Sequence, residues 1–476
     1  MYTANMRFAA ALLVAIVALP GCVATRDAIA LAGGVATLEA LFTVKAEGAR
    51  FSLRAITRAP HCPDVLWSGA SGERMRIRAE PALLPLRGDS AQADAKPARF
   101  DALVCEVDWP QRATAATVHN RTLRAPSAAP QRIVLIADTG CRMKASENAF
   151  QACNDPARWP FADVAKNAAA LKPDWVIHIG DIHYRESPCP VGNDDCAGSP
   201  WGYGADAWRA DFFEPATPLL AAAPWVFVRG NHESCFRAGQ GWFRFVDAAP
   251  YTTARSCDIA ANDAEADFTE PYAVPLGGGA QWVVFDSSKS SGKPYAVTDP
   301  AFAKYAAQIE QVATLAKQAE HSFFLSHHPL FAFAPQTKKN GAEAAKPGGS
   351  GGLQSAFASR YAERLLPDEV SVVMHGHVHL FQAMSFSTNH PASMILGNSG
   401  SANEGRAPTE IAPGTAAYPG ALVDDYAAHS DFGFALLERV SPTSATQWRL
   451  TEYDVAGNAK IRCEIQGQKS RCSAAK

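Results

Sequence analysis

The feature that most constrains the fold is a series of short apolar runs, each followed at once by glycine or a polar residue. They begin after residue 131 and are rich in β-branched and aromatic residues, which is typical of strands buried on both faces. Strands are predicted at Ile133–Ala137, Trp175–Ile179, Trp225–Arg229, Trp282–Phe285, Phe323–Ser326 and Ser371–Met374. Helices are predicted between them at Phe161–Leu171, Phe302–Glu320 and Leu353–Leu365. This alternation predicts a layered α/β sheet with a site at the strand ends.

Five of these strands end in residue types that bind metal ions. In chain order the motifs are Asp138-Thr139-Gly140, Gly180-Asp181-Ile182-His183-Tyr184, Gly230-Asn231-His232-Glu233, Ser326-His327-His328-Pro329 and His375-Gly376-His377-Val378-His379. Carboxylates and an amide offer hard oxygen donors, and imidazoles suit zinc, iron, nickel or manganese-class ions. Each motif alone is weak evidence, because a lone Gly-Asp or His-x-His is more often a turn or a surface pair. All five in this order indicate a pair of metal ions.

The spacing within the motifs suits such a centre. Alternation along an extended segment places His377 and His379 on the same side. A glycine beside a ligand lets the backbone turn sharply and approach the site without a Cβ clash. One carboxylate can bridge both ions in two-metal hydrolysis. The motifs therefore predict one shared centre.

The ordered set resembles the metallophosphoesterase superfamily over roughly residues 132–405, and within it the purple acid phosphatases. Many superfamily members carry a histidine ligand where this chain has Gly140. Tyr184, three residues after Asp181, matches the Gly-Asp-x-x-Tyr signature of purple acid phosphatases. The resemblance implies that Tyr184 is a phenolate ligand to ferric iron. The alternative is a core or rim aromatic.

The resemblance also implies a fold and a ligand set. The fold is an α+β or α/β four-layer αββα metallophosphoesterase sandwich, preceded by a small β domain. Ferric iron would be held by Asp138, Asp181, Tyr184 and His379. A divalent ion (Fe2+, Zn2+ or Mn2+) would be held by Asp181, Asn231, His327 and His377, with Asp181 as the bridge. His232 would contact the substrate phosphate and protonate the leaving oxygen.

These residues predict an acid-phosphatase-like enzyme that hydrolyses phosphate monoesters of a small substrate by attack of metal-activated hydroxide. Asp181 and His232 are the predicted catalytic residues. Two alternatives remain: a metallophosphodiesterase or nucleotidase with a Mn or Zn pair, in which Tyr184 binds no metal, and an envelope lipoprotein with a structural metal site. With 44 basic and 47 acidic residues and a net charge of −3, no long nucleic acid is expected as a partner.

Three further histidines match no ligand position: His183, His328 and His375. A structural role is favoured for each, because most side-chain hydrogen bonds satisfy local groups. Plant purple acid phosphatases carry further histidines after the fourth motif, and this chain has none between His328 and His375. Substrate contacts are therefore expected to differ.

The N-terminus, residues 1–22, reads as an export signal with Arg7 before an apolar run at Phe8–Leu19. Leu19-Pro20-Gly21-Cys22 resembles a bacterial lipobox, which implies membrane anchoring through a lipidated Cys22. Pro20 departs from the usual pattern, so simple cleavage nearby and a cytosolic protein with a buried N-terminal helix stay open. The predicted location is the periplasm or cell envelope.

The remaining segments are predicted from composition and periodicity. They are a tether or helix at 23–43, a small β domain at 44–125, a linker at 126–131, a catalytic domain at 132–460 and a C-terminal tail at 461–476. Residues 337–352, rich in Gly, Lys and Ala, are predicted as a mobile loop. The β domain would be a spacer or a binding module.

Cysteine usage also predicts export. Of 11 cysteines, ten remain when Cys22 is removed or lipidated, and an even number suits an oxidising compartment. Neighbours along the chain would pair as Cys62–Cys105, Cys141–Cys153, Cys189–Cys196, Cys235–Cys257 and Cys463–Cys472. The sequence alone does not fix this connectivity. No Cys-x-x-Cys spacing occurs, which favours disulfides over a thiolate metal site.

Overall fold

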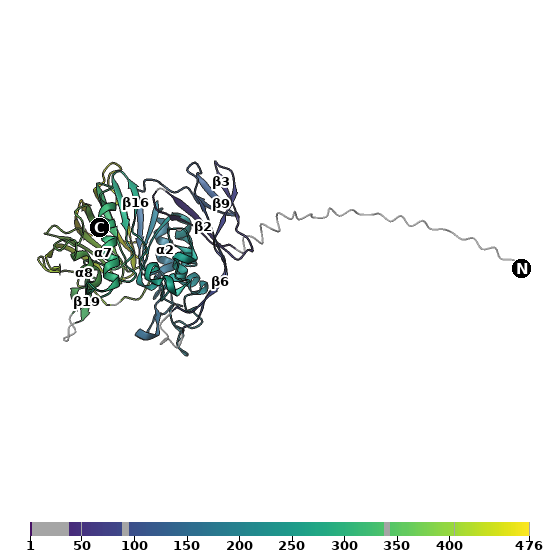
Figure 1. The fold of residues 1–476 in the computed structure, drawn as a ribbon, viewed down its shortest axis with the longest axis horizontal. Coiled ribbons are helices and arrows are strands. Elements are labelled where there is room, and N and C mark those ends of the chain that lie inside the picture. Colours follow the sequence, from purple (N-terminus) through teal and green to yellow (C-terminus); the bar gives the residue numbers. More distant parts are fainter. Residues whose placement is uncertain (2–37, 49, 88–94, 338–342, 404, 476) are drawn as a thin grey trace.

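Two β-sheets lie face to face between two layers of helices in the computed structural model, which describes residues 1, 38–48, 50–87, 95–337, 343–403 and 405–475. Figure 1 shows α7 (Pro300–Ala316) and α8 (Gly351–Ala358) at one side of the molecule and strands of a small N-terminal sheet at the other. The predicted four-layer αββα sandwich with an N-terminal β region is confirmed.

The first sheet has 11 strands, and its centre is three parallel strands, β11, β14 and β15. In spatial order they are β29 (Lys469–Ala474), β28 (Ala459–Gln466), β27 (Gln447–Asp454), β26 (Gly433–Arg439), β11 (Arg132–Ile136), β14 (Trp175–Ile179), β15 (Trp225–Val228), β1 (Leu38–Lys45), β2 (Phe51–Thr57), β8 (Leu103–Asp108) and β5 (Arg76–Ala79). The carboxyl ends of β11, β14 and β15 therefore meet at one edge.

The second sheet has eight strands, of which β17, β18, β21 and β23 are parallel. In spatial order they are β16 (Tyr272–Gly277), β17 (Ala280–Val284), β18 (His321–Leu325), β21 (Val370–His375), β23 (Ala392–Leu396), β22 (Phe381–Phe386), β25 (Ala421–His429) and β24 (Ala416–Tyr418). The six strands predicted from the sequence are all present, within two residues of the predicted bounds.

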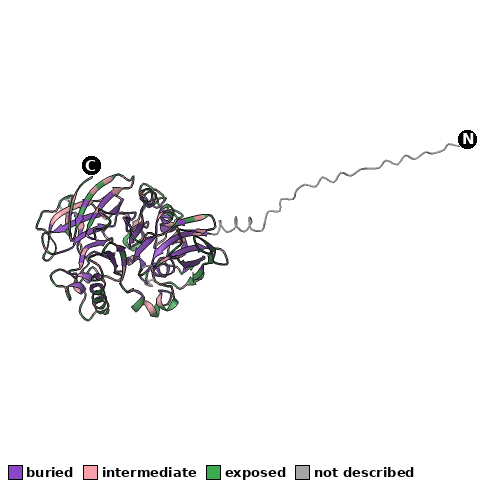
Figure 2. Cartoon of the chain, turned by 90° about the horizontal axis from the view of Figure 1, so that it is seen from above, coloured by how far each residue is buried: buried purple, intermediate pink, exposed green. Residues whose placement is uncertain are grey.

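Side chains alternate between the two faces of each strand, and this explains how the sheets pack both against each other and against the helices. In β11, Ile133 and Leu135 enter the core between the two sheets, whereas Val134 and Ile136 face the helices. The helices α2 (Phe161–Ala170), α4 (Thr217–Ala222) and α5 (Gly239–Phe245) cover the first sheet, and α7 and α8 cover the second. Figure 2 shows the resulting buried interior. Both faces of the central strands are buried, which is why they read as continuous apolar runs.

Shorter elements lie in the connections. The short helices in these connections are η1 (Ala145–Glu147), α3 (Ala205–Trp208), η2 (Arg209–Phe213), η3 (Asn231–Glu233), η4 (Thr253–Arg255), η5 (Ala260–Asn262) and α6 (Asp263–Ala266). The two-stranded pairs are β12 (Met143–Lys144) with β13 (Ala149–Phe150), β6 (Ala82–Leu84) with β7 (Ala98–Phe100), and β19 (Phe333–Thr337) with β20 (Glu343–Pro347). The prediction of a loop across 337–352 is therefore wrong at 343–347, which pair with β19.

The small N-terminal β region shares a sheet with the rest of the molecule. Its four-stranded sheet, β10 (Arg121–Arg124), β9 (Ala115–Val118), β3 (Asp64–Ser68) and β4 (Glu73–Arg74), packs over β1, β2 and β8 around a core of its own. β1 pairs in parallel with β15, Val44 lying opposite Trp225. The prediction of a tether or helix at 23–43 is wrong for residues 38–43, which belong to the strand β1, with Leu38 and Leu41 in this core and Ala40 and Phe42 in the core beneath the helices. The predicted export signal and Cys22 lie outside the described residues.

The C-terminus is likewise part of the first sheet. β28 and β29 form a hairpin, and Cys463 and Cys472 lie opposite each other in it as a disulfide. Residues 461–475 are therefore not the predicted tail, because the backbone of β28 hydrogen-bonds to β27.

All five predicted disulfides are confirmed: Cys62–Cys105, Cys141–Cys153, Cys189–Cys196, Cys235–Cys257 and Cys463–Cys472. Such a set fits an oxidising compartment. Within the described ranges, no helix combines the length and apolar character that a bilayer crossing requires.

A buried histidine makes the fold sensitive to acid. His321, at the start of β18, is buried against Phe323, and burial together with the charge of Arg439 lowers its pKa to about 4. The unfolded chain takes up this proton near pH 6.5, so the contribution of His321 to stability is present above that pH and is lost as pH falls toward 4. We expect His321→Gln to weaken the pH dependence of the free energy of unfolding between pH 7 and 4 by about 3 kcal/mol. Urea unfolding at both pH values measures it; the exposed His61→Gln is the control, and an unchanged pH dependence contradicts the prediction.

Candidate metal centre

The seven predicted metal-binding residues lie at the edge where the carboxyl ends of the parallel strands meet. Asp138 follows β11, Asp181 and Tyr184 follow β14, Asn231 follows β15, His327 follows β18, and His377 and His379 follow β21. Three of these strands belong to the first sheet and two to the second. The site is therefore assembled by packing the two sheets together.

The hydroxyl of Tyr184 lies at the centre of one group of donors. Its oxygen is 2.8 Å from Asp138 Oδ1, 3.0 Å from Asp181 Oδ2 and 2.9 Å from His379 Nε2. One hydroxyl hydrogen serves only one of these three neighbours at a time. Burial and the charges of Asp138 and Asp181 raise the pKa of Tyr184 well above its usual value. A cation among these atoms would reverse that effect, because it favours the ionised form of its ligands.

A second group of donors shares Asp181. Ligand atoms of Asp181, His327 and His377 all lie within 4.8 Å of one another, with His327 Nε2 3.0 Å from Asp181 Oδ2. Asn231 lies beside Asp181 in space, because the next backbone N–H, that of His232, donates to Asp181 Oδ1 at 2.8 Å. The two groups therefore have Asp181 in common.

Backbone carbonyls fix the orientation of two imidazoles. His327 Nδ1 donates to the carbonyl of Ile179 at 2.8 Å, and His379 Nδ1 donates to the carbonyl of Ala402 at 2.7 Å. Because a carbonyl only accepts, each Nδ1 carries the hydrogen and each Nε2 faces the carboxylates. Metal-binding histidines are commonly held in this way.

The charges at the site also fit bound cations. Burial disfavours ionised Asp138, but His327 and His379 outweigh it and lower its pKa. Burial would lower the pKa of His327, yet Asp181 and Asp138 raise it to about 9. Asn231 Oδ1 is buried and accepts no hydrogen bond from any described residue. Two buried carboxylates beside an unused amide oxygen suit two metal ions.

The backbone is strained at three of the predicted ligands. Asp138, Asp181 and His377 have φ values of 55°, 55° and 70°, in the left-handed region that residues other than glycine rarely adopt. Such conformations persist where the surrounding structure enforces them and are concentrated at functional sites. Gly230 fits against Asp181 so closely that an added Cβ would lie 2.1 Å from Asp181 Oδ1.

Glu233 holds two of the ligand-bearing turns together. Its buried carboxylate accepts hydrogen bonds from four backbone N–H groups, those of Asp181 (3.0 Å), Ile182 (2.8 Å), His183 (3.1 Å) and Gly230 (3.1 Å). From the sequence, no role was predicted for Glu233. Only its position directly after Asn231 and His232 could have indicated one.

Asp211 supports Tyr184 in the same manner and was also missed. Its carboxylate accepts from the backbone N–H groups of Tyr184 at 2.7 Å and Cys141 at 3.0 Å, and pairs with Arg185 at 2.6 Å. No motif surrounds Asp211 in the sequence, so only the structure reveals it.

His232, the predicted proton donor, lies against the ring of Tyr184 with a centroid separation of 3.8 Å. Glu186 Oε1 is 2.8 Å from its Nδ1, and Arg237 Nη2 is 2.7 Å from both ring nitrogens. Burial and the charge of Arg237 lower the pKa of His232 to about 4, despite Asp181 and Glu186. Neither Glu186 nor Arg237 was singled out from the sequence.

The other three histidines differ in their distance from the centre. His183 is buried against Tyr203 and hydrogen-bonds to no described residue through its ring. His375 Nδ1 bonds to Ser326 Oγ at 3.0 Å, away from the ligand atoms. The ring of His328 lies 4.3 Å from that of His377, so His328 borders the site without joining either donor group.

A family model described as calcineurin-like phosphoesterase matches residues 131–381, more than half of the chain and all seven predicted ligands. The chain belongs to this family. It is thus a metallophosphoesterase-superfamily hydrolase, whose members generally use a dinuclear metal centre, and the suspected superfamily is confirmed.

Two solved structures are similar to the chain. A purple acid phosphatase, PPD1, from yellow lupin (Lupinus luteus) is 14% identical with a TM-score of 0.53, covering 91% of this chain and 74% of that one. PhoD is 12% identical with a TM-score of 0.49, covering 92% of each chain. No curated protein sequence matches the chain significantly. At 14% identity the lupin enzyme shows a shared fold alone.

The close contact at Gly230 predicts the effect of one methyl group. In Gly230→Ala the new Cβ would force apart the backbone after β15 and the turn at Asp181. We expect metal affinity to fall about tenfold or more, the effect typical of disturbing the groups that hold ligands. Titration calorimetry with Zn2+ or Mn2+ measures it. Gly292→Ala is the control, because an added Cβ there meets no atom within 4 Å, and equal affinities in the two variants contradict the prediction.

Proposed function

We propose that the protein is an exported, purple acid phosphatase-like enzyme that hydrolyses phosphate monoesters at a centre of ferric iron and a divalent ion. The observation that carries the proposal is the Tyr184 hydroxyl, which lies within 3.0 Å of Asp138, Asp181 and His379. A hard, anionic oxygen set of this kind suits a trivalent ion.

The proposed assignment follows the two donor groups. Ferric iron would be held by Asp138, Asp181, Tyr184 and His379, and Fe2+, Zn2+ or Mn2+ by Asp181, Asn231, His327 and His377. Such a pair, when bound, lowers the pKa of a water and neutralises charge on phosphoryl oxygens. Asp181 would be the bridge, because it belongs to both donor groups.

His232 would hold a proton near the leaving oxygen. Its backbone N–H is fixed on Asp181 and its ring is fixed by Tyr184, Glu186 and Arg237. With a pKa lowered to about 4, the ring carries a proton mainly at acidic pH. General-acid assistance by His232 would therefore be strongest in acid.

A second candidate is a phosphodiesterase or nucleotidase with a Mn or Zn pair, in which Tyr184 binds no metal. The observation in its favour is the Tyr184 hydroxyl, which is placed to donate its hydrogen to Asp138 Oδ1 at 2.8 Å, as a phenol that binds no metal would. The two candidates differ in colour, because only a ferric phenolate absorbs strongly in the visible range.

Replacement of Tyr184 distinguishes the candidates. The purified wild type is expected to be purple to pink and to hydrolyse p-nitrophenyl phosphate, whereas Tyr184→Phe loses the colour and at least about tenfold in rate. Visible absorption, metal analysis and steady-state rates measure this. Tyr305→Phe is the matched control, because Tyr305 is fully buried in α7, away from the site. A colourless, active wild type would favour the second candidate.

Export to the periplasm or cell envelope, with anchoring through a lipidated Cys22, is part of the proposal. The five disulfides support an oxidising compartment. We expect the wild type in the membrane fraction and Cys22→Ser in the soluble periplasmic fraction, since the variant has no thiol to acylate. Cell fractionation with mass spectrometry of the mature N-terminus tests it, and wild-type protein cleaved without lipid would refute the anchor.

A further inference from the structure

A positively charged side chain from outside the metal-binding motifs lies beside the site. Arg237 follows η3 by a few residues, and its Nη2 is 2.7 Å from both ring nitrogens of His232. His232 Nε2 lies in turn 3.8 Å from Asp181 Oδ2, so His232 alone stands between the guanidinium and this carboxylate. Its guanidinium is therefore within electrostatic range of the residue that both donor groups share.

Glu186 fixes the position of this guanidinium. Its Oε1 accepts a hydrogen bond from Arg237 Nε at 2.6 Å and also contacts Nη2. The carboxylate is buried, and Arg237, with a side chain that is 17% exposed, is the solvent-facing member of the pair. Arginine has five N–H donors in a rigid fork, which is more than its contacts with Glu186 and His232 require.

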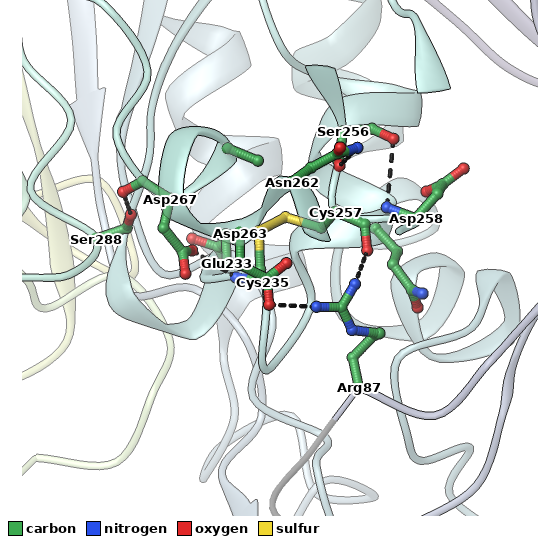
Figure 3. The surroundings of a disulfide bond; sticks show 12 residues. Arg87, Glu233, Cys235, Ser256, Cys257, Asp258, Asn262, Asp263, Asp267 and Ser288 are labelled. Carbon is green, nitrogen blue, oxygen red and sulfur yellow. Dashed lines mark hydrogen bonds and ion pairs between the residues drawn. A yellow bond between two sulfur atoms is a disulfide. The ribbon is translucent and has the colours of Figure 1, made fainter. Parts of the chain in front are cut away.

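The backbone at residues 235–237 is also held in place. Cys235 is joined to Cys257, its N–H donates to Asp267 Oδ1 at 2.7 Å, and the N–H of Arg237 donates to the carbonyl of Ser234 at 2.9 Å. Figure 3 shows the disulfide with Asp267 on one side and Arg87 on the other. Arg237 is thus pre-organised and pays little conformational entropy on binding a ligand.

An anion would join Arg237 to the proposed metal pair. Arg237 lies beside His232, so two cations bound at the Asp181 groups would repel its guanidinium, and Glu186 would offset this only in part. A phosphate group between the ions and Arg237 converts the repulsion into attraction. Arginine is the residue best suited to phosphate oxygens, through charge-assisted and bidentate hydrogen bonds.

We propose that Arg237 binds a non-bridging oxygen of the substrate phosphate and makes the site prefer phosphate monoesters over diesters. This inference rests on the proposed function and deepens it. A monoester carries a second negative charge above pH ~6, whereas a diester carries one. A fixed positive charge beside the bound phosphate would therefore stabilise the monoester more.

The test compares Arg237→Gln and Arg237→Lys with the wild type. For Arg237→Gln we expect KM for p-nitrophenyl phosphate and the dissociation constant of inorganic phosphate each to rise about 10- to 100-fold, the effect of one hydrogen bond to a charged group. KM for bis(p-nitrophenyl) phosphate is expected to rise less than about threefold. Arg237→Lys keeps the charge and should recover part of the phosphate affinity. Calorimetry measures phosphate binding independently of turnover.

Arg209→Gln is the matched control. Its side chain is also 17% exposed and paired with carboxylates, those of Glu39 and Asp101, but it contacts none of the proposed ligands. We expect this variant to match the wild type in phosphate affinity. Metal content of every variant shows whether the centre is intact, and Arg237→Lys decides the question if Arg237→Gln does not fold.

Two outcomes would overturn the inference. Equal losses on monoester and diester with unchanged phosphate affinity would mean that Arg237 only positions His232. Unchanged kinetics on both substrates would mean that it has no role at the site. A wild type that hydrolyses neither ester would instead refute the proposed function, while the calorimetric comparison with Arg237→Gln would still decide whether Arg237 binds phosphate.

Discussion

The site depends on the burial of two carboxylates beside each other. Asp138 and Asp181 both lie within hydrogen-bond distance of the same hydroxyl, that of Tyr184, and both are shielded from water. Buried charges of like sign are costly without counter-ions. The imidazole of His327 compensates in part, as its raised pKa indicates. Two cations would compensate the remaining charge and would also satisfy Asn231 Oδ1, which is why this composition suits a metal pair.

The fold supplies this arrangement through the direction of its strands. Parallel strands place their carboxyl ends at one edge, and packing two such sheets brings two edges together. The backbone then has to turn sharply directly after each strand, which explains the left-handed conformations of Asp138, Asp181 and His377. Glu233 stabilises the turns after β14 and β15, because its single carboxylate binds four N–H groups that would otherwise be buried without partners.

The sequence predicted the features that are local. Strand ends, the residue types that follow them and disulfides between neighbouring cysteines depend on short stretches; the strands and disulfides were predicted correctly. Residues 38–43 were missed as a strand although β1 pairs along its length with the next strand, β2; only its pairing with β15 spans some 180 positions. Glu186 and Arg237 were missed because each lies in a loop outside the metal-binding motifs, and only the three-dimensional contact with His232 gives it significance.

Three arginines of the N-terminal β region join it directly to the catalytic domain, so it is not held by a linker alone. The carboxyl end of α5 leaves backbone carbonyls without helical partners. Arg54 and Arg78, from β2 and β5, donate to those of Phe245 and Phe243, at 2.7 and 2.8 Å. Arg87 donates to the carbonyl of Cys257, whose disulfide holds the segment that carries Arg237 (Figure 3). The N-terminal region therefore holds both the end of α5 and the disulfide-linked segment that carries Arg237.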